Sequence, residues 1–437
     1  MPTIRRLGLT ALLLGAASAA FTLARSLDTA EASAAPRLGE AAVLDLDLAF
    51  YRSRIARDSF AARDHAELAR LHLQRARGSG AGEADLARAE THARRSLALR
   101  TGRNEEAFHV LAASLMGRHR FAEARSVAER LVAMDSASRP ARAMLGEIQL
   151  ELGAYDDARR TFGTLLTVRT DLVVATRYAR WEEIRGRPEE ARRLLRSARD
   201  EALNRHDVPA AQAGWFHWRL GDLALRHGRL SEAERELTAG LTLAPDDHRL
   251  LDGLARVAAA RDRWPEAIEL GERAIARALD PATLGLLALS YEALGDSVRG
   301  AEYDRAMSVA ARGKSGEFHR FWSLFLLDRG RDVPEVLARA RKEIRTRHDV
   351  YGWDLLAWAL YRSGRHAEAR TAMGRALAMR TRDAMLFFHA GMIEAAVGER
   401  EAARRHLAAA LAINPSWHPL QPAQAREKLA RLSADGR

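Results

Sequence analysis

The chain has 437 residues, of which 47% are hydrophobic and 29% are charged, with only 12 Pro and no Cys. The lack of Cys excludes disulfides, thiolate metal sites, Cys nucleophiles and a lipoprotein anchor. The net charge is +11, and only Lys314, Lys342 and Lys428 are lysines, so the other 66 of the 69 cations are Arg. These arginines are spread along the chain without a dense basic run, which makes nucleic acid an unlikely partner.

The N-terminus carries the pattern of an export signal. Arg5 and Arg6 precede an apolar stretch over residues 7–24, and Ala32–Ala34 supplies the small residues of a cleavage site. Residues 1–34 are therefore predicted to be a secretory signal peptide. The stretch is also marginally long enough to be an uncleaved membrane anchor. A third interpretation, an Ala-rich leader with neither role, stays open. Either of the first two interpretations places the protein outside the cytoplasm, in the periplasm or cell envelope.

Residues 35–69 are predicted to form a linker and N-terminal capping helices. Ala30–Arg37 is the expected linker, and Leu44–Arg57 and Ser59–Arg77 have helical patterns. The first of these helices is expected to cover one end of a helical stack, since terminal units of such stacks need a polar outer side.

One turn motif then recurs with a period near 34 residues. A full copy is GAYDDA at Gly153–Ala158, where Gly suits the end of a helix and the acidic residues suit the start of the next. The closing Ala allows the two helices to approach closely. The alanines at this position are Ala89, Ala124, Ala158, Ala191, Ala233, Ala267, Ala301, Ala369 and Ala403. Their separations of 35, 34, 33, 42, 34, 34, 68 and 34 residues predict ten helix–turn–helix units.

Two of these separations depart from the period. The separation of 68 spans two units, so a degenerate unit is predicted around Glu335, where Gly330 keeps the turn. The separation of 42 is one period plus eight residues. The extra residues are placed at Leu203–Ala211 as a stretched loop or an extended helix end.

Apolar residues follow the same phase. With the closing Ala as position 20, positions 4, 7, 8 and 11 form one stripe on the first helix, and position 24 is apolar on the second. In the unit at 350–383 these residues are Trp353, Leu356, Ala357, Leu360 and Met373. Pro245 and Pro415 stand at position 32, where Pro ends a helix.

This pattern resembles the tetratricopeptide repeat over about residues 70–417. The resemblance implies an all-α fold, a right-handed α-solenoid of about ten tetratricopeptide-like repeats. Residues 418–437 are expected to supply a C-terminal capping helix, Gln424–Leu432, and a tail.

No motif for chemistry is found in the sequence. It has no phosphate-binding loop, no dinucleotide fingerprint, no zinc-protease motif and no nucleophile elbow. Its 15 His show no ligand spacing with a third partner nearby. The acidic residues lie mainly in the turn motifs, where helix starts explain them. We therefore predict no enzyme activity, no cofactor and no metal.

The resemblance further implies that the first helices line a concave groove, with positions 2, 5, 9 and 12 pointing into it. Those positions hold Trp215, Trp218 and Asp222; Arg249, Asp252 and Arg256; Tyr351, Asp354, Trp358 and Tyr361; and Met385, Phe388 and Met392. Aromatic and Arg side chains are typical anchors for a partner. The opposing interpretation is that the rings fill space between adjacent first helices or under the terminal cap.

Two classes of function remain. The first is a non-catalytic scaffold of the bacterial cell envelope that binds a partner peptide or helix in the groove. The second is an Arg-rich solenoid that holds an anionic polymer, either nucleic acid or cell-surface polysaccharide. Membrane contact is expected only through an uncleaved N-terminal segment, and no oligomeric state follows from the sequence.

Overall fold

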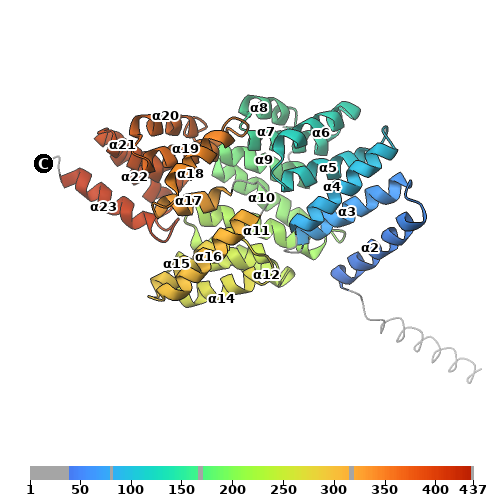
Figure 1. Ribbon diagram of the computed structural model, residues 1–437, viewed down its shortest axis with the longest axis horizontal. Helices are drawn as coiled ribbons and strands as arrows, with labels where there is room; N and C mark the ends of the chain where they lie inside the picture. Colours follow the sequence, from blue (N-terminus) through green and yellow to red (C-terminus); the bar gives the residue numbers. More distant parts are fainter. Residues whose placement is uncertain (1–38, 79–81, 166–170, 314–318, 435–437) are drawn as a thin grey trace, which may run out of the picture. The chain divides into compact units, whose positions relative to one another are not determined.

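The computed structural model describes residues 39–78, 82–165, 171–313 and 319–434, and all regular structure in those ranges is helical (Figure 1). The prediction of an all-α repeat fold is confirmed. The predicted signal peptide or anchor, residues 1–34, lies outside the described residues. The chain divides into two units, Met1–Ser53 and Arg54–Arg437.

The first unit contributes most of helix α2, Glu40–Arg57. Three large apolar side chains on α2 are exposed and lie three and four residues apart, namely Val43, Leu46 and Phe50. This spacing places them along one side of the helix.

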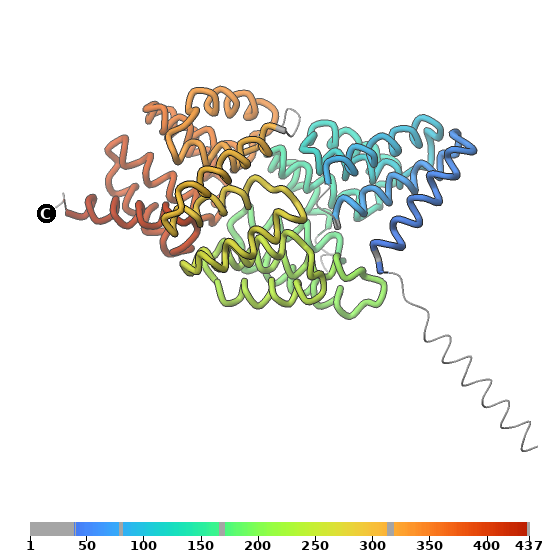
Figure 2. The backbone as a smooth tube through the Cα atoms, turned by 60° about the horizontal axis from the view of Figure 1, so that its bottom comes forward, coloured from blue at the N-terminus to red at the C-terminus, as the bar shows by residue number. Residues whose placement is uncertain are grey.

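The second unit is a series of helix pairs, each made of a first and a second antiparallel helix (Figures 1 and 2). The first helices are α3 (Ala62–Gly78), α5 (Glu105–Gly117), α7 (Arg139–Leu152), α9 (Leu172–Ile184), α11 (Ala210–Arg226), α13 (His248–Ala259), α15 (Pro281–Ala293), α17 (Arg320–Asp328), α19 (Val350–Arg362) and α21 (Ala384–Ala396). The second helices are α4 (Gly82–Leu99), α6 (Phe121–Met134), α8 (Tyr155–Gly163), α10 (Pro188–Leu203), α12 (Leu230–Leu243), α14 (Trp264–Ile275), α16 (Ser297–Gly313), α18 (Val333–Glu343), α20 (His366–Ala376) and α22 (Arg400–Ile413). A last helix, α23 (Gln421–Ala434), follows the tenth pair.

The predicted boundary at residue 70 falls inside α3, which packs mainly on α4, so the helix pairs begin at Ala62. The eight extra residues near Leu203–Ala211 lengthen the neighbouring helices. Helix α10 has 16 residues and α11 has 17, whereas α9 has 13.

Local sequence explains where the first helices start. Five of them follow an Asp whose carboxylate accepts hydrogen bonds from backbone amides of the first turn, at Asp171, Asp247, Asp280, Asp349 and Asp383. Such an Asp satisfies amides that have no partner within the helix and places negative charge at the positive end of the helix dipole.

The turns inside the pairs have a left-handed residue where the motif places a helix-ending Gly. Seven motif glycines, from Gly153 to Gly398, have φ between 67° and 86°. Where the motif lacks Gly, His119 and Asp262 adopt the same conformation, with φ of 54° and 58°. The turn geometry is therefore retained even where a side chain makes it less favourable.

Small and large residues interlock between the paired helices. A Cβ atom added to Gly221 would lie 2.5 Å from Leu237, and one added to Gly391 would lie 2.6 Å from Leu407. Both glycines stand at position 8 of the first-helix stripe, and both leucines stand at the apolar position 24 of the second helix. The helices are so close at these two positions that only Gly, which has a hydrogen atom in place of a side chain, fits without a shift.

Eight of the nine closing alanines are completely buried, as the motif predicts. The prediction for Ala301 is wrong, because this residue is exposed and Gly300 occupies the buried position instead. A Cβ atom on Gly300 would lie 2.9 Å from Glu292 and 3.2 Å from the carbonyl oxygen of Ala288. Gly295, which opens this turn, precedes Gly300 by five residues, the same spacing as Gly153 and Ala158, so the phase shifts by one residue here.

Within the second unit, segments about 190 residues apart in the chain contact each other. The His348 amide donates to Leu152 O over 3.1 Å, and the Val350 amide donates to the Tyr155 hydroxyl over 2.7 Å. The Thr381 hydroxyl donates to Ile184 O, and the Asn414 amide group donates to Leu225 O. We call this set the seam. It joins the helix ends of α7–α11 to the start of α19 and to the segments that precede α19 and α21 and follow α22.

Buried apolar side chains complete the seam. Ile184, Val350 and Leu386 form one cluster, with partly buried neighbours that include Tyr155 and Tyr351. The repeats around α7–α11 thus pack against the repeats around α19–α22 as well as on their own neighbours.

Candidate partner-binding surface

The first helices α9, α11 and α13 carry a connected set of charged side chains. We call it the first-helix face, and it comprises Arg180, Glu183, Arg219, Asp222, Arg226, Asp252 and Arg256, together with Trp215 and Trp218. Five of the predicted site residues, all of them on α11 or α13, belong to this face.

Glu183 is the centre of the ion pairs on this face. Its carboxylate lies 2.7 Å from both Arg219 and Arg226 and 3.1 Å from Arg180. Burial alone would raise the pKa of Glu183, but the three guanidinium groups outweigh burial and lower it. The carboxylate is therefore charged across the physiological range.

Asp222 links α11 to α13. It pairs with Arg226 at 3.0 Å and contacts Arg256 at 3.4 Å. Arg256 is 41% exposed, so this cation is the most accessible of the four arginines on the face.

Asp252 lies beside Arg256 and has a different electrostatic environment. The Thr283 hydroxyl donates to it over 2.9 Å. Burial raises the pKa of Asp252 to about 6, with Asp280 acting in the same direction and Arg256 opposing both. Asp252 therefore changes charge at a pH at which Glu183 and Asp222 are already ionised.

Two indole rings flank the charges. The rings of Trp215 and Trp218 are 6.3 Å apart, and both are partly exposed. The guanidinium groups of Arg219 and Arg249 lie 5.7 Å and 5.8 Å from the Trp218 ring. Contacts at this distance hold the ring in place.

Tyr351 reaches the same face from the seam. Its ring lies 5.6 Å from the guanidinium carbon of Arg180, which in turn pairs with Glu183. Burial and the nearby Asp383 raise the pKa of Tyr351 to about 12. A residue of the ninth pair is thus in contact with the charges of the fourth.

The other predicted residues on α19 and α21 pack inside the repeats. Asp354, Trp358 and Phe388 are 1%, 2% and 0% exposed. Asp354 pairs with His389 at 2.8 Å, and the Trp358 ring stacks on His389 at 4.2 Å. These contacts match the opposing interpretation, in which the rings fill space between adjacent first helices.

Trp358 also has a polar partner. Its indole nitrogen donates to Asp328 over 2.9 Å, and Asp328 accepts a second hydrogen bond, 3.0 Å long, from Gln421 of α23. Tyr361 stacks on Trp358 at 4.7 Å, and Met392 packs at the edge of the same cluster. Both are partly exposed. This group holds α17, α19, α21 and the C-terminal cap together.

Sequence reasoning missed Arg180, Glu183, Arg219 and Arg226. Arg180 and Glu183 occupy positions 9 and 12 of the unit at 172, which the same groove pattern designates. The irregular apolar stripe of that unit concealed them. Arg219 and Arg226 lie outside the four groove positions and reach Glu183 through their length.

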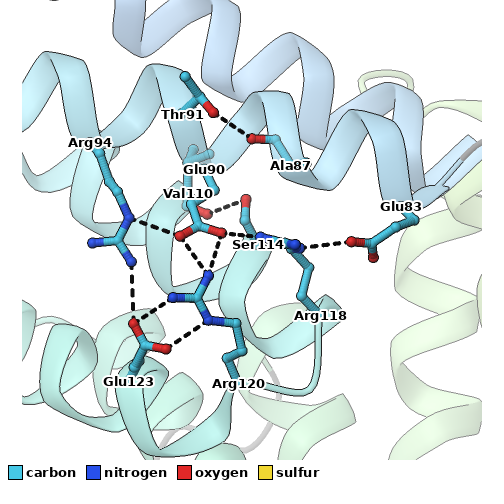
Figure 3. Close-up of polar contacts among 10 residues, drawn as sticks. All are labelled: Glu83, Ala87, Glu90, Thr91, Arg94, Val110, Ser114, Arg118, Arg120 and Glu123. Atoms are coloured by element: carbon cyan, nitrogen blue, oxygen red, sulfur yellow. Dashed lines mark hydrogen bonds and ion pairs between the residues drawn. The ribbon is translucent and has the colours of Figure 1, made fainter. Parts of the chain in front are cut away.

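Arginines elsewhere connect consecutive repeats. Glu90 on α4 is 7% exposed and binds Arg94 at 2.8 Å, Arg118 at 2.5 Å and Arg120 at 2.8 Å (Figure 3). Arg118 and Arg120 flank the turn of the next pair. Burial would raise the pKa of Glu90, but hydrogen bonds from Arg94 and Arg118 lower it overall.

The same arrangement recurs further along. Glu234 on α12 lies 2.7 Å from Arg261 and 3.0 Å from Arg263, which flank the α13–α14 turn. Arg331 of the α17–α18 turn pairs with Asp304 on α16. Acidic side chains of second helices thus neutralise arginines of the following turn, which accounts for part of the basic composition.

The described ranges contain no group of three or more side chains that could hold a metal ion. In the same ranges no helix combines the length and the apolar character that crossing a bilayer requires.

The paired helices, their left-handed turns and the interlocking small and large positions define an α-helical repeat protein. Models of the tetratricopeptide repeat family match residues 115–175, 218–283 and 355–418. The chain is a tetratricopeptide repeat protein, as its sequence pattern predicts.

Three solved structures of low identity are similar to the chain. They are the Cut9–Hcn1 hetero-tetramer of the APC/C, PilW, described as a widely conserved type IV pilus biogenesis factor, and PilF of Pseudomonas aeruginosa. Their identities are 14%, 20% and 16%, with TM-scores of 0.34, 0.39 and 0.38. The alignments cover 90%, 49% and 51% of this chain and 96%, 96% and 97% of those chains. No curated protein sequence matches the chain.

Proposed function

We propose that the protein is a non-catalytic interaction scaffold of the bacterial cell envelope that binds a peptide or helix of a partner on its first-helix face. Proteins built from tetratricopeptide repeats generally mediate contacts between proteins. The observation that carries the proposal is the partly exposed Trp215–Trp218 pair on α11, the helix whose Asp222 contacts the accessible Arg256 of α13.

The chemistry of this face suits a peptide that combines apolar and acidic side chains. Trp218 offers apolar area at a ring already held by two guanidinium groups, so little side-chain entropy is lost on binding. Arg256 makes only one long contact, 3.4 Å to Asp222, and can turn toward a partner carboxylate.

The inter-repeat ion pairs weigh against the anionic-polymer alternative. Arg118, Arg120, Arg261 and Arg263 each contact a carboxylate of the preceding repeat. A polymer that bound these cations would first have to displace protein carboxylates. The scaffold proposal therefore places binding at the aromatic pair.

The envelope location rests on the sequence of residues 1–34. If the signal peptide is removed after Ala34, N-terminal sequencing of the mature protein starts at Ala35. A mature chain that retains Met1 and fractionates with membranes would instead identify an anchor.

The binding proposal is tested by capturing partners from an envelope extract of the source organism with the wild-type chain and with a Trp218→Ala/Arg256→Ala variant. We expect the variant to retain a specific partner at least tenfold less, since loss of a central Trp or Arg anchor commonly costs about 2 kcal/mol or more. Quantitative mass spectrometry of the captured proteins measures the ratio.

Trp353→Ala is the matched control. Trp353 is also a partly exposed Trp with a nearby guanidinium, Arg375 at 4.4 Å, but that contact faces the second helix of its own pair. The control should capture the partner as the wild type does. Equal capture by all three proteins would refute binding at this face. Capture that disappears steeply as salt rises would favour the anionic-polymer class.

A further inference from the structure

The seam is a contact that a tetratricopeptide array does not need in order to fold. In such arrays each repeat is stabilised by its own helices and by its immediate neighbours. The seam instead joins residues separated by 189 to 197 positions, such as Asn414 with Leu225 and Thr381 with Ile184. It can therefore break while every repeat keeps its neighbour contacts.

The seam is built from turns and helix ends rather than from helix faces. Arg347 donates to Glu151 O over 3.0 Å and also pairs with the Glu151 carboxylate. The next two hydrogen bonds of the seam come from the backbone amides of His348 and Val350. Hydrogen bonds of this kind can be exchanged for water without loss of a helix.

Two motif glycines allow the backbones to approach. A Cβ atom on Gly153 would lie 2.5 Å from the His348 carbonyl, and one on Gly186 would lie 2.2 Å from Arg380 O. Side chains at these positions are incompatible with the closed seam. By contrast, a Cβ atom on Gly364 or Gly398 would meet nothing within 4 Å, although both residues have the same left-handed backbone.

The seam is connected directly to the first-helix face. Val350, whose amide binds Tyr155, is followed by Tyr351, whose ring lies 5.6 Å from Arg180. Arg180 pairs with Glu183, and Glu183 binds the arginines of α11. Separation of α19 from α8 would remove Tyr351 from this network.

We propose that the seam is a latch: it holds the repeats around α19–α22 against those around α7–α11, and it opens without unfolding to admit a bulky partner to the first-helix face. The identity of the admitted molecule rests on the proposed function. The latch itself does not, because its opening can be measured with no partner present.

The test compares the full chain carrying Gly153→Ala/Gly186→Ala with the full chain carrying Gly364→Ala/Gly398→Ala. Both variants place Ala at two left-handed positions, so their backbone costs match, and only the first pair clashes across the seam. Hydrogen exchange of peptides that contain the His348 and Val350 amides reports the seam. We expect at least tenfold faster exchange in the first variant, no change in the second, and unchanged far-ultraviolet circular dichroism in both.

A second readout measures access. The chain has no Cys, so Arg256→Cys introduces a single thiol on the first-helix face. We expect a maleimide carrying a large polyethylene glycol chain to label this thiol at least fivefold faster in the seam variant than in the control. A small maleimide should label both at similar rates.

Three outcomes would overturn the latch. They are unchanged exchange at His348 and Val350 in the seam variant, loss of helical signal when the seam opens, and equal labelling by the large reagent in both variants.

If the glycine variants aggregate, Tyr155→Phe/Arg347→Gln is tested instead. It removes two polar contacts of the seam without a clash, and the same exchange and labelling results are expected. Failure of the capture experiment would contradict the proposed function and leave these measurements unaffected.

Discussion

Asp252 shows how the environment of a single carboxylate can differ from that of its neighbours. Glu183 and Asp222 each contact two or three guanidinium groups, and their pKa values are lowered. Asp252 has Arg256 nearby but receives only one neutral hydrogen bond, from Thr283, and its pKa is raised by burial to about 6. Close arginines, rather than position on the face, decide which carboxylate stays ionised.

The raised pKa of Asp252 predicts a pH dependence of stability. The unfolded carboxyl titrates near 3.9 and the folded one near 6, so the folded state binds more protons between these values. The contribution of Asp252 to stability therefore falls as pH rises from about 4 to about 6. Replacing Asp252 by Asn should stabilise the protein by about 1–2 kcal/mol at pH 7.5 and by almost nothing at pH 4.

Urea denaturation of both proteins at the two pH values measures this difference. Asn retains an oxygen that can accept from Thr283, so the comparison isolates the charge. A gain that is equal at both pH values would show that the charge is not the cause.

At the scale of single elements, the turn inside each pair determines how the two helices meet. A left-handed residue ends the first helix, and the second begins directly afterwards with exposed acidic residues. Asp262 occupies this position in the α13–α14 turn with φ of 58°. It is exposed, so its side chain contributes little packing to offset the conformational cost.

Asp262→Gly is therefore expected to stabilise the protein by about 0.5–1 kcal/mol, because Gly adopts the left-handed conformation without a Cβ clash. Ala260→Gly is the matched control. Ala260, two residues earlier, has φ of −65°, and Gly there should destabilise by about 1 kcal/mol. Urea denaturation of the two variants gives the comparison, and the same sign for both would contradict the argument.

At the scale of the second unit, every interface between repeats contributes to stability. A capping helix, α23, covers the C-terminal end of the array. Helix α23 packs on α21 and α22, with Ala425 completely buried, and Gln421 binds Asp328 of the eighth pair. Arrays of this kind do not unfold in one step, because each interface contributes separately. The C-terminal repeats depend on this helix for the burial of their last apolar face.

Deletion of residues 418–437 should loosen the C-terminal pairs alone. We expect amides of α21 and α22 to exchange at least tenfold faster, because their apolar face becomes exposed, while amides of α13 and α14 keep their rates. Hydrogen exchange followed by mass spectrometry resolves these segments. Equal loss of protection in α13 and α14 would indicate one cooperative unit instead of an array.

The sequence by itself determined the repeat architecture of this protein. The 34-residue period of the turn motif predicted the helix pairs, the left-handed turns and the buried alanines, because these depend on residues close together in the chain. Among the closing alanines it misplaced Ala301, where a one-residue shift moved the contact to Gly300. It also designated Trp215, Trp218, Asp222, Asp252 and Arg256, whose partners lie on adjacent first helices.

Only the tertiary structure decided which aromatic residues are buried and where the array contacts itself. Trp358 and Trp218 occupy equivalent stripes in the sequence, yet the first is buried, stacked on His389 and hydrogen-bonded to Asp328, and the second is partly exposed. The seam has no local signal, since its hydrogen bonds use backbone groups that every residue possesses. Small rotations between successive repeats add up over about six pairs, and their sum determines which turns meet.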